Sequence, residues 1–201
     1  MEKPKLTGTV TVAATGEPIQ HFAVRVSKYQ TLGNGPDYVQ DPRWLQVSDS
    51  NGRYTVELIG PGIYQAQVSV DGYAWIWSNQ VQIEGGTAEL NFKVTPGGSL
   101  SGGVLDPSGK PLAGAKVIPL SMARSVVERS EARFEGDAGA VATGADGRFT
   151  IEHLAGGAET VKVLAAEYAP LIVDNLKVTE GQTTDAGVMK LSVGGAVEGV
   201  V

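Results

Sequence analysis

The sequence predicts an all-β protein built from two tandem copies of a small seven-stranded β-sandwich. Glycine occurs 27 times and proline 10 times among the 201 residues. The apolar residues are mostly Val, Ile, Leu and Ala in short runs, which is typical of short strands joined by tight turns rather than of long helices. The chain also repeats itself at a spacing close to one small domain, and a domain of that size can bury a core without crosslinks.

The internal repeat keeps the same order in both copies. Tyr73 returns as Tyr168, and five longer segments return at a spacing of roughly 95 positions. The matched segments are 6–10 with 100–104, 16–19 with 109–112, 49–56 with 144–151, 58–62 with 154–157, and 81–87 with 176–183. A repeat of full domain length is too long for a solenoid unit, so it indicates two separate domains.

Each copy opens with the same pair of strands. The first strand alternates apolar and small residues and ends at a Gly-x-Pro turn, in which proline sets one backbone angle and glycine takes the positive one. A second strand follows at 22–26 in the first copy and at 115–118 in the second. A long insertion comes next, at 27–46 and at 119–141.

Behind each insertion, the dipeptides Asn51-Gly52 and Asp146-Gly147 predict two-residue hairpins, because both positions tolerate a positive φ. The remaining strands alternate as half-buried strands do. They are expected at 54–58 and 149–151, at 64–70 and 161–165, and on either side of the turns at 85–86 and 181–182.

The domain boundaries follow from these patterns. We expect one sandwich at 1–95 and a second at 99–192, with the Pro- and Gly-rich segment 95–99 as the linker. Residues 193–201 either begin the truncated first strand of a third repeat or close the second sandwich as a tail strand. The first alternative would make the chain a part of a longer array.

The two insertions differ in composition. The first is rich in Gly, Pro, Tyr and Trp, and the second is more charged. Arg124 and Glu128 form an attractive pair at helical spacing, whereas Arg129 and Arg133 form a repulsive one. This part of the second insertion is predicted as a short helix or as an extended hairpin.

Composition excludes several classes of function. There is no cysteine, so neither a disulfide framework nor a thiolate metal site can form. The formal charge is −6 and the 16 basic residues are scattered, which argues against a nucleic acid or an anionic membrane surface as partner. No apolar run is long enough to cross a bilayer, so no membrane insertion is expected. The charged start at 1–5 is not expected to be a signal peptide.

Three segments of the second copy carry a resemblance to a known family. Residues 102–117 resemble the opening of a carboxypeptidase regulatory-like domain, 143–149 resemble its central hairpin, and 154–157 resemble the turn that follows. The resemblance covers nearly the whole chain twice and is closer in the second copy. It implies a transthyretin-like (prealbumin-like) sandwich with Greek-key connections, similar also to collagen-adhesin B-type repeats.

That resemblance further implies a non-catalytic module without a cofactor, commonly secreted, periplasmic or displayed on the cell surface, and often part of a larger multidomain protein. It does not imply one ligand, because one fold hosts many functions. We therefore expect an extracytoplasmic location on the strength of the resemblance alone.

The sequence offers few residues that could form a catalytic or metal site. The two histidines, His21 and His153, fall in different copies, so a zinc peptidase lacks its converging ligands and each histidine is read as a turn or edge residue. Asp49, Asn51 and Glu57 offer too few oxygens for calcium. No serine lies in a nucleophile-elbow pattern, and the histidine set and C-terminal motif of hydroxyisourate hydrolase, which shares the fold, are absent.

The relatives among collagen adhesins carry a self-formed Lys–Asn crosslink, which this chain is not expected to form. Asn91 lies on a predicted last strand, but the first strand, 6–12, has no lysine. Gln65 and Gln67 stand where the proton-shuttling acid would be required.

The retained candidate is aromatic. Tyr73, Trp75 and Trp77 alternate along one predicted strand and would therefore share a face, and Trp44 lies in the first insertion. Such side chains stack on sugar rings or anchor protein interfaces. The second copy has Tyr168, Pro170 and Ile172 in the matching places, which favours a buried face for the strand and leaves Trp44 as the better candidate for exposure.

Two hypotheses follow. The first is a non-catalytic structural or interaction module that binds other protein domains and is a monomer when isolated. The alternative is a carbohydrate-binding module in which Trp44, Trp75, Trp77 and Tyr73 contact a polysaccharide.

Overall fold

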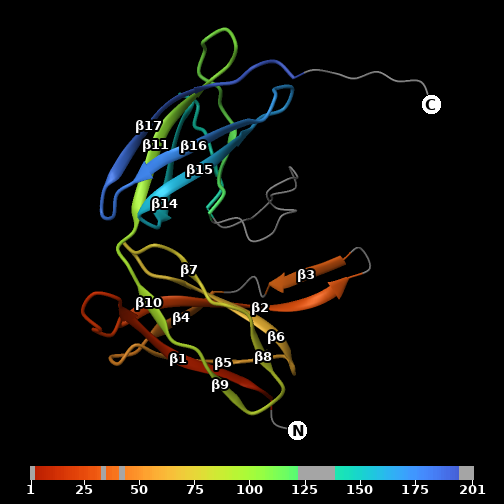
Figure 1. The fold of residues 1–201 in the computed structure, drawn as a ribbon, viewed down its shortest axis with the longest axis vertical. Helices are drawn as coiled ribbons and strands as arrows, with labels where there is room; N and C mark the ends of the chain where they lie inside the picture. The colour runs from red at the N-terminus through yellow and green to blue at the C-terminus, as the bar shows by residue number, and fades with distance from the viewer. Residues whose placement is uncertain (1–2, 33–34, 41–43, 122–138, 195–201) are drawn as a thin grey trace, which may run out of the picture. The chain divides into compact units, whose positions relative to one another are not determined.

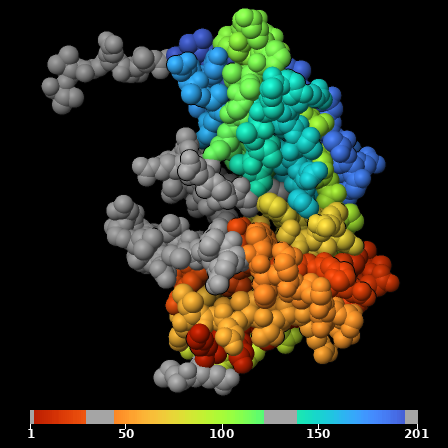
Figure 2. All heavy atoms as spheres, turned by 180° about the vertical axis from the view of Figure 1, so that it is seen from behind, coloured from red at the N-terminus to blue at the C-terminus, as the bar shows by residue number. Residues whose placement is uncertain are grey.

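A computed structural model describes residues 3–32, 35–40, 44–121 and 139–194 of the chain (Figure 1). The chain divides into two compact units, Met1–Pro96 and Gly97–Val201, which are described separately below. All described elements are strands, with no helix among them, which confirms the predicted all-β class. Figure 2 shows the heavy atoms of each unit as a closely filled body, red to yellow for unit 1 and green to blue for unit 2.

The first sheet of unit 1 is built around β1 (Lys5–Val12). Strand β5 (Arg53–Glu57) pairs with it antiparallel. On its other side, β9 (Thr87–Glu89) and β10 (Phe92–Val94) pair with it in parallel, one after the other. The first and last strands of the unit therefore lie side by side.

The second sheet of unit 1 has β2 (His21–Leu32) and β6 (Gly62–Ser69) at its centre. Two short strands line each outer side of this central pair. Those on β2 are β3 (Gly35–Gln40) and β4 (Leu45–Ser48), and those on β6 are β7 (Ile76–Trp77) and β8 (Val81–Ile83).

The core of unit 1 lies between these two sheets, which makes the unit a sandwich. Leu6 and Val10 of β1 contribute from one sheet, and Val24 and Val68 of β2 and β6 contribute from the other. Tyr54 ties the aromatic part together, since its ring centroid lies 6.3 Å from that of Phe22 and 6.2 Å from that of Phe92.

Unit 2 repeats the arrangement. Strand β11 (Gly98–Leu105) lies between β14 (Arg148–Leu154), antiparallel, and β17 (Thr183–Lys190), parallel. The other sheet has the order β13-β12-β15-β16, and its strands are β12 (Lys116–Pro119), β13 (Val141–Ala142), β15 (Gly157–Leu164) and β16 (Leu171–Val178). The core is again drawn from both sheets, with Leu100, Ile151 and Val163 fully buried.

The predicted count of seven strands per copy is not confirmed, because the described residues of unit 1 form ten strands. One reason is the insertion 27–46: β2 continues to Leu32 and pairs with β3, which the second copy does not match in its described part. The helix or hairpin predicted in the second insertion lies at 122–138, outside the described residues, and so do 195–201 of the predicted third repeat.

The predicted two-residue hairpins are wrong in their pairing, although the turns exist. Strand β4 pairs with β2, whereas β5 pairs with β1, so the turn at Asn51-Gly52 joins strands of different sheets. Asp49 holds this turn, since its Oδ1 accepts hydrogen bonds from the amides of Asn51 at 2.9 Å and Arg53 at 3.0 Å. Gly52 has a φ of 67°, which explains the residue type without requiring a hairpin. In the second copy, too, β13 pairs with β12 and β14 with β11.

A glycine in the first strand of each unit makes room for an irregularity in its pairing with the last strand, which is a break between β9 and β10 in unit 1 and a register shift between β11 and β17 in unit 2. A Cβ on Gly8 would lie 1.8 Å from the carbonyl oxygen of Leu90, in the gap between β9 and β10. A Cβ on Gly102 would lie 2.8 Å from both the Gly187 carbonyl oxygen and the ring of Phe149. Glycine is therefore required by close approach at these two positions.

Candidate functional site

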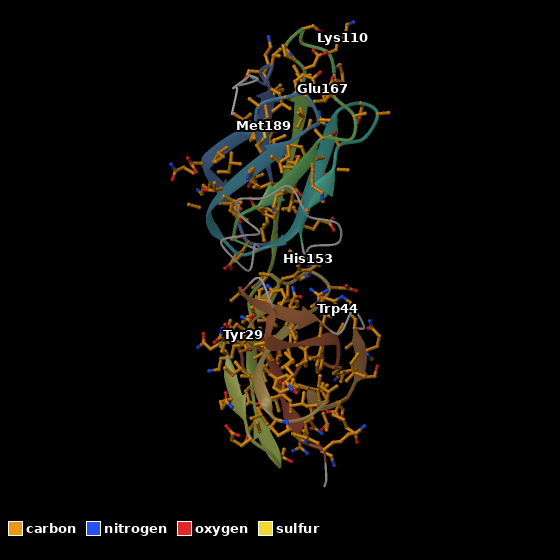
Figure 3. The ribbon with its side chains drawn as sticks, turned by 90° about the vertical axis from the view of Figure 1, so that its right-hand side faces the viewer. Tyr29, Trp44, Lys110, His153, Glu167 and Met189 are labelled. Carbon is orange, nitrogen blue, oxygen red and sulfur yellow. The ribbon has the colours of Figure 1, made fainter. Side chains whose placement is uncertain are left out.

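The most elaborate polar arrangement of unit 1 lies on the outer face of its second sheet. Side chains alternate along β2, so Val24 points to the core and Arg25 points outward. Arg25 is opposite Gln67 on β6, and Gln67 is opposite Trp77 on β7. Trp44, which Figure 3 labels, directly precedes β4, and β4 pairs with β2 on the side away from β6. These four residues, Trp44, Arg25, Gln67 and Trp77, are called the stacked row below.

The guanidinium group of Arg25 is the centre of the stacked row. Its Cζ lies 4.6 Å from the ring centroid of Trp44 and 5.8 Å from that of Trp77. One Arg25 Nη donates a hydrogen bond to Gln67 Oε1 at 2.6 Å. Arg25 is 8% exposed and Gln67 is fully buried. Aromatic faces and a hydrogen-bond acceptor are the partners that make a buried guanidinium tolerable.

The structure divides the predicted aromatic residues between two faces. Tyr73 and Ile76 pack against the core, whereas Trp77, next to Ile76, lies on the outer face with Arg25. Strand β7 covers only Ile76–Trp77, so the prediction that Tyr73, Trp75 and Trp77 share one strand face is wrong. Trp44 and Trp75 are partly buried, so Trp44 is less exposed than expected.

Arg25 itself was missed by sequence reasoning. It is the only charged residue of the apolar segment 22–26, and a cation in such a segment is a signal for a partnered side chain. Sequence patterns do not reveal the strand register of the second sheet, and this register places Arg25 between two tryptophans from distant segments.

The second copy has different residues at the matching positions. Ile118 on β12 is opposite Lys162 on β15, and Lys162 is opposite Ile172 on β16. The register is the same as that of Arg25, Gln67 and Trp77, so the stacked row belongs to the first copy alone.

Unit 2 has a polar arrangement of its own, at the start of its insertion. Glu159 on β15 is 5% exposed. Its Oε1 accepts hydrogen bonds from the amides of Ser121 at 3.1 Å and Thr160 at 2.9 Å, and its Oε2 accepts one from the Ser121 hydroxyl. Three donors stabilise this buried carboxylate.

The residues considered for metals and catalysis are dispersed. His21 is exposed, with its Nδ1 3.0 Å from Ser48 Oγ, and His153 lies in the other unit with a φ of 62°. In the parts of the chain that the structure describes, no three His, Cys, Asp or Glu residues gather as a metal site. The Arg53 and Asn51 amides hold the pKa of the Asp49 carboxyl below its ordinary value, which fits a turn-forming role.

Asn91 lies in the break between β9 and β10 rather than on a strand. Its Oδ1 accepts hydrogen bonds from the Thr9 amide at 2.8 Å and the Thr9 hydroxyl at 2.9 Å, and its Nδ2 donates to Glu89 Oε1 at 2.8 Å. The amide replaces the backbone bonds that the break removes, which gives Asn91 a structural role.

These features define a β-sandwich protein of two units. Its polar side chains hold turns, form hydrogen bonds across a strand break, and build the stacked row. The chain belongs to the carboxypeptidase regulatory-like domain family, whose model matches residues 5–95 and again 99–192. Each match covers one copy of the repeat. No curated protein sequence matches the chain.

Solved structures with partial likeness include two bacterial pilins. The minor pilin GBS52 of Streptococcus agalactiae is 13% identical, with 98% of this chain and 99% of that chain covered and a TM-score of 0.38. The shaft pilin SpaA of Lactobacillus rhamnosus GG is 12% identical, with 98% and 99% covered and a TM-score of 0.35. A cohesin–X-dockerin complex of Acetivibrio cellulolyticus is 19% identical over 48% of this chain and 58% of that chain, with a TM-score of 0.36.

The described residues contain no helix with the length and apolar character that crossing a bilayer requires.

Proposed function

We propose that the chain is a non-catalytic interaction module within a larger secreted or surface-located protein. The observation that carries the proposal is the stacked row, which places two tryptophans and an arginine on one outer sheet face of unit 1. Trp and Arg are the residue types that dominate binding energy at protein interfaces. Trp44 and Trp77 are both partly exposed, so a partner can reach them.

The perturbed side chains support a non-catalytic role. Burial raises the pKa of the Tyr54 and Tyr64 hydroxyls, each of which donates to a backbone carbonyl at 2.6 Å. The Ser108 hydroxyl and the Lys110 amide hold the pKa of Asp106 low in a surface turn. Catalytic groups with shifted pKa values cluster in one place, whereas these three groups belong to separate turns and strand contacts.

The proposal is tested by selecting binders from a random peptide-display library against the full chain. Peptides that bind the wild-type protein should lose about tenfold or more in affinity with Trp77→Ala, as expected for an anchor residue. Thr150→Ala, an exposed change on β14 of unit 2, is the matched control and should bind as wild type. Far-UV circular dichroism checks that both variants are folded. Equal binding by all three proteins would reject the stacked row as the interaction surface.

A polysaccharide is the alternative ligand, favoured by the position of Trp44 and Trp77 on the same sheet face. Indole rings stack on sugar rings, but here one ring face of each is turned toward Arg25. Titration with a panel of soluble polysaccharides should quench tryptophan fluorescence in the wild-type protein and not in Trp44→Ala. No quench with any polysaccharide would remove this alternative.

A further inference from the structure

Both insertions begin at equivalent positions in the pairing between the two central strands of the second sheet. In unit 1, the pairing of β2 with β6 extends to Lys28 opposite Tyr64. In unit 2, the pairing of β12 with β15 ends at Pro119, and the Leu120 amide still donates to the Thr160 carbonyl at 2.8 Å. The next residue, Ser121, therefore comes to lie beside Glu159.

The contacts at this point differ in chemistry between the copies. In unit 2, the buried Glu159 carboxylate accepts hydrogen bonds from the Ser121 amide and hydroxyl, so two hydrogen bonds hold the last residue described before the gap at 122–138. In unit 1, the Lys28 ammonium lies 5.7 Å from the ring centroid of Tyr64. A neutral ring thus stands in the first copy where the second has a carboxylate.

The insertion of unit 1 is held at its other end as well. Trp44 is the last residue before β4, and its ring is stacked on the Arg25 guanidinium. Arg25 is itself fixed by Gln67, so Trp44 is tied to the centre of the sheet rather than to its edge. Ile118, the matching residue of unit 2, has no charge or planar group for such stacking.

We propose that Arg25 and Glu159 are positioning residues, each of which anchors the insertion of its own copy to the sheet. The inference rests on the proposed function in one respect: the insertions are the variable loops that would carry recognition on a shared scaffold. Neither anchor has a counterpart in the other copy, so the described end of each insertion is held by a contact of its own.

Hydrogen exchange of the full chain, read by mass spectrometry, tests the anchors one at a time. Arg25→Ile introduces the residue of the second copy and should speed exchange in Leu45–Ser48 by about tenfold or more, with Ser121 and Thr160 unchanged. Glu159→Ala should speed exchange at Ser121 and Thr160 and leave exchange in Leu45–Ser48 unchanged. Amides in Lys5–Val12 and Gly98–Leu105 serve as internal references, because a general loss of stability would speed their exchange too.

Two conservative variants and one spectroscopic measurement complete the design. Arg25→Lys keeps the charge without the planar group, and Glu159→Gln keeps an acceptor without the charge, so each should give an intermediate rate. Tryptophan emission should shift to the red in Arg25→Ile only, because all three tryptophans lie in unit 1. Wild-type exchange in Leu45–Ser48 and at Ser121 in the respective variants, or equal acceleration across a whole unit, would overturn the proposal. These measurements need no partner, so they fail or succeed separately from the peptide selection.

Discussion

At the scale of single residues, Gly8 shows how little space lies between β1 and the break between β9 and β10. Its missing Cβ would lie 1.8 Å from a backbone oxygen that no side-chain rotation can move. We predict that Gly8→Ala destabilises unit 1 at or above the upper end of the roughly 1–3 kcal/mol typical of overpacking. Thermal unfolding followed by tryptophan fluorescence measures the effect. Gly85→Ala is the control, since no atom lies within 4 Å of its Cβ and the change should be nearly neutral.

The aspartates of the surface turns determine part of the response to acid. The pKa of Asp106 is lowered by the Ser108 hydroxyl and the Lys110 amide, and that of Asp49 by the Arg53 and Asn51 amides. A lowered folded-state pKa contributes stability above the unfolded-state value near 3.8, and that stability is lost as the pH falls through the folded value.

We therefore predict that Asp106→Asn flattens the decline of the melting temperature between about pH 4 and pH 2, because this group no longer titrates. The measurement is a series of thermal melts across that range, followed by circular dichroism. An acid decline identical to that of the wild-type protein would contradict a role for this carboxylate.

At the scale of elements, the tyrosine of β5 connects the two outer strands of its sheet. Tyr54 donates from its hydroxyl to the Leu90 carbonyl at 2.6 Å, across β1 and into the break between β9 and β10. The second copy has Phe149 at this position, so the ring alone satisfies the packing.

We predict that Tyr54→Phe costs about 1 kcal/mol of stability by removing this one hydrogen bond. Chemical denaturation with the fluorescence of unit 1 as probe gives the value, and the exposed neighbour change Thr55→Ala should cost much less. A neutral Tyr54→Phe would mean that water replaces the hydroxyl at Leu90.

At the scale of the whole molecule, the two units each have a complete core, and we expect them to unfold separately. All three tryptophans lie in unit 1, so tryptophan fluorescence reports on unit 1 while circular dichroism reports on both. Ile151 is fully buried in unit 2, and Ile151→Ala should cost about 2–5 kcal/mol there. The melting transition seen by fluorescence should stay in place while part of the circular-dichroism signal moves to lower temperature. A fluorescence midpoint that moves with Ile151→Ala would show that the units unfold together.

The sequence predicts local features of this molecule well and long-range pairing less well. Asn51-Gly52 and Asp146-Gly147 mark turns correctly, because the positive φ of each glycine is a local property. The sheet that each flanking strand joins depends on residues far along the chain, and there the hairpin prediction is wrong. The stacked row is missed for the same reason, since Trp44, Arg25 and Trp77 meet only through the register of the second sheet.

The parallel pairing of first and last strands has a consequence for biosynthesis. The parallel neighbours of β1 are β9 and β10, and the parallel neighbour of β11 is β17, and each pair is separated by nearly the whole copy. A nascent chain leaves the ribosome from its N-terminus, so one edge of β1 stays unpaired until β9 and β10 have been synthesised. All strands of the first sandwich are then synthesised before β14 and β17, the partners of β11. The two units can therefore fold one after the other during translation.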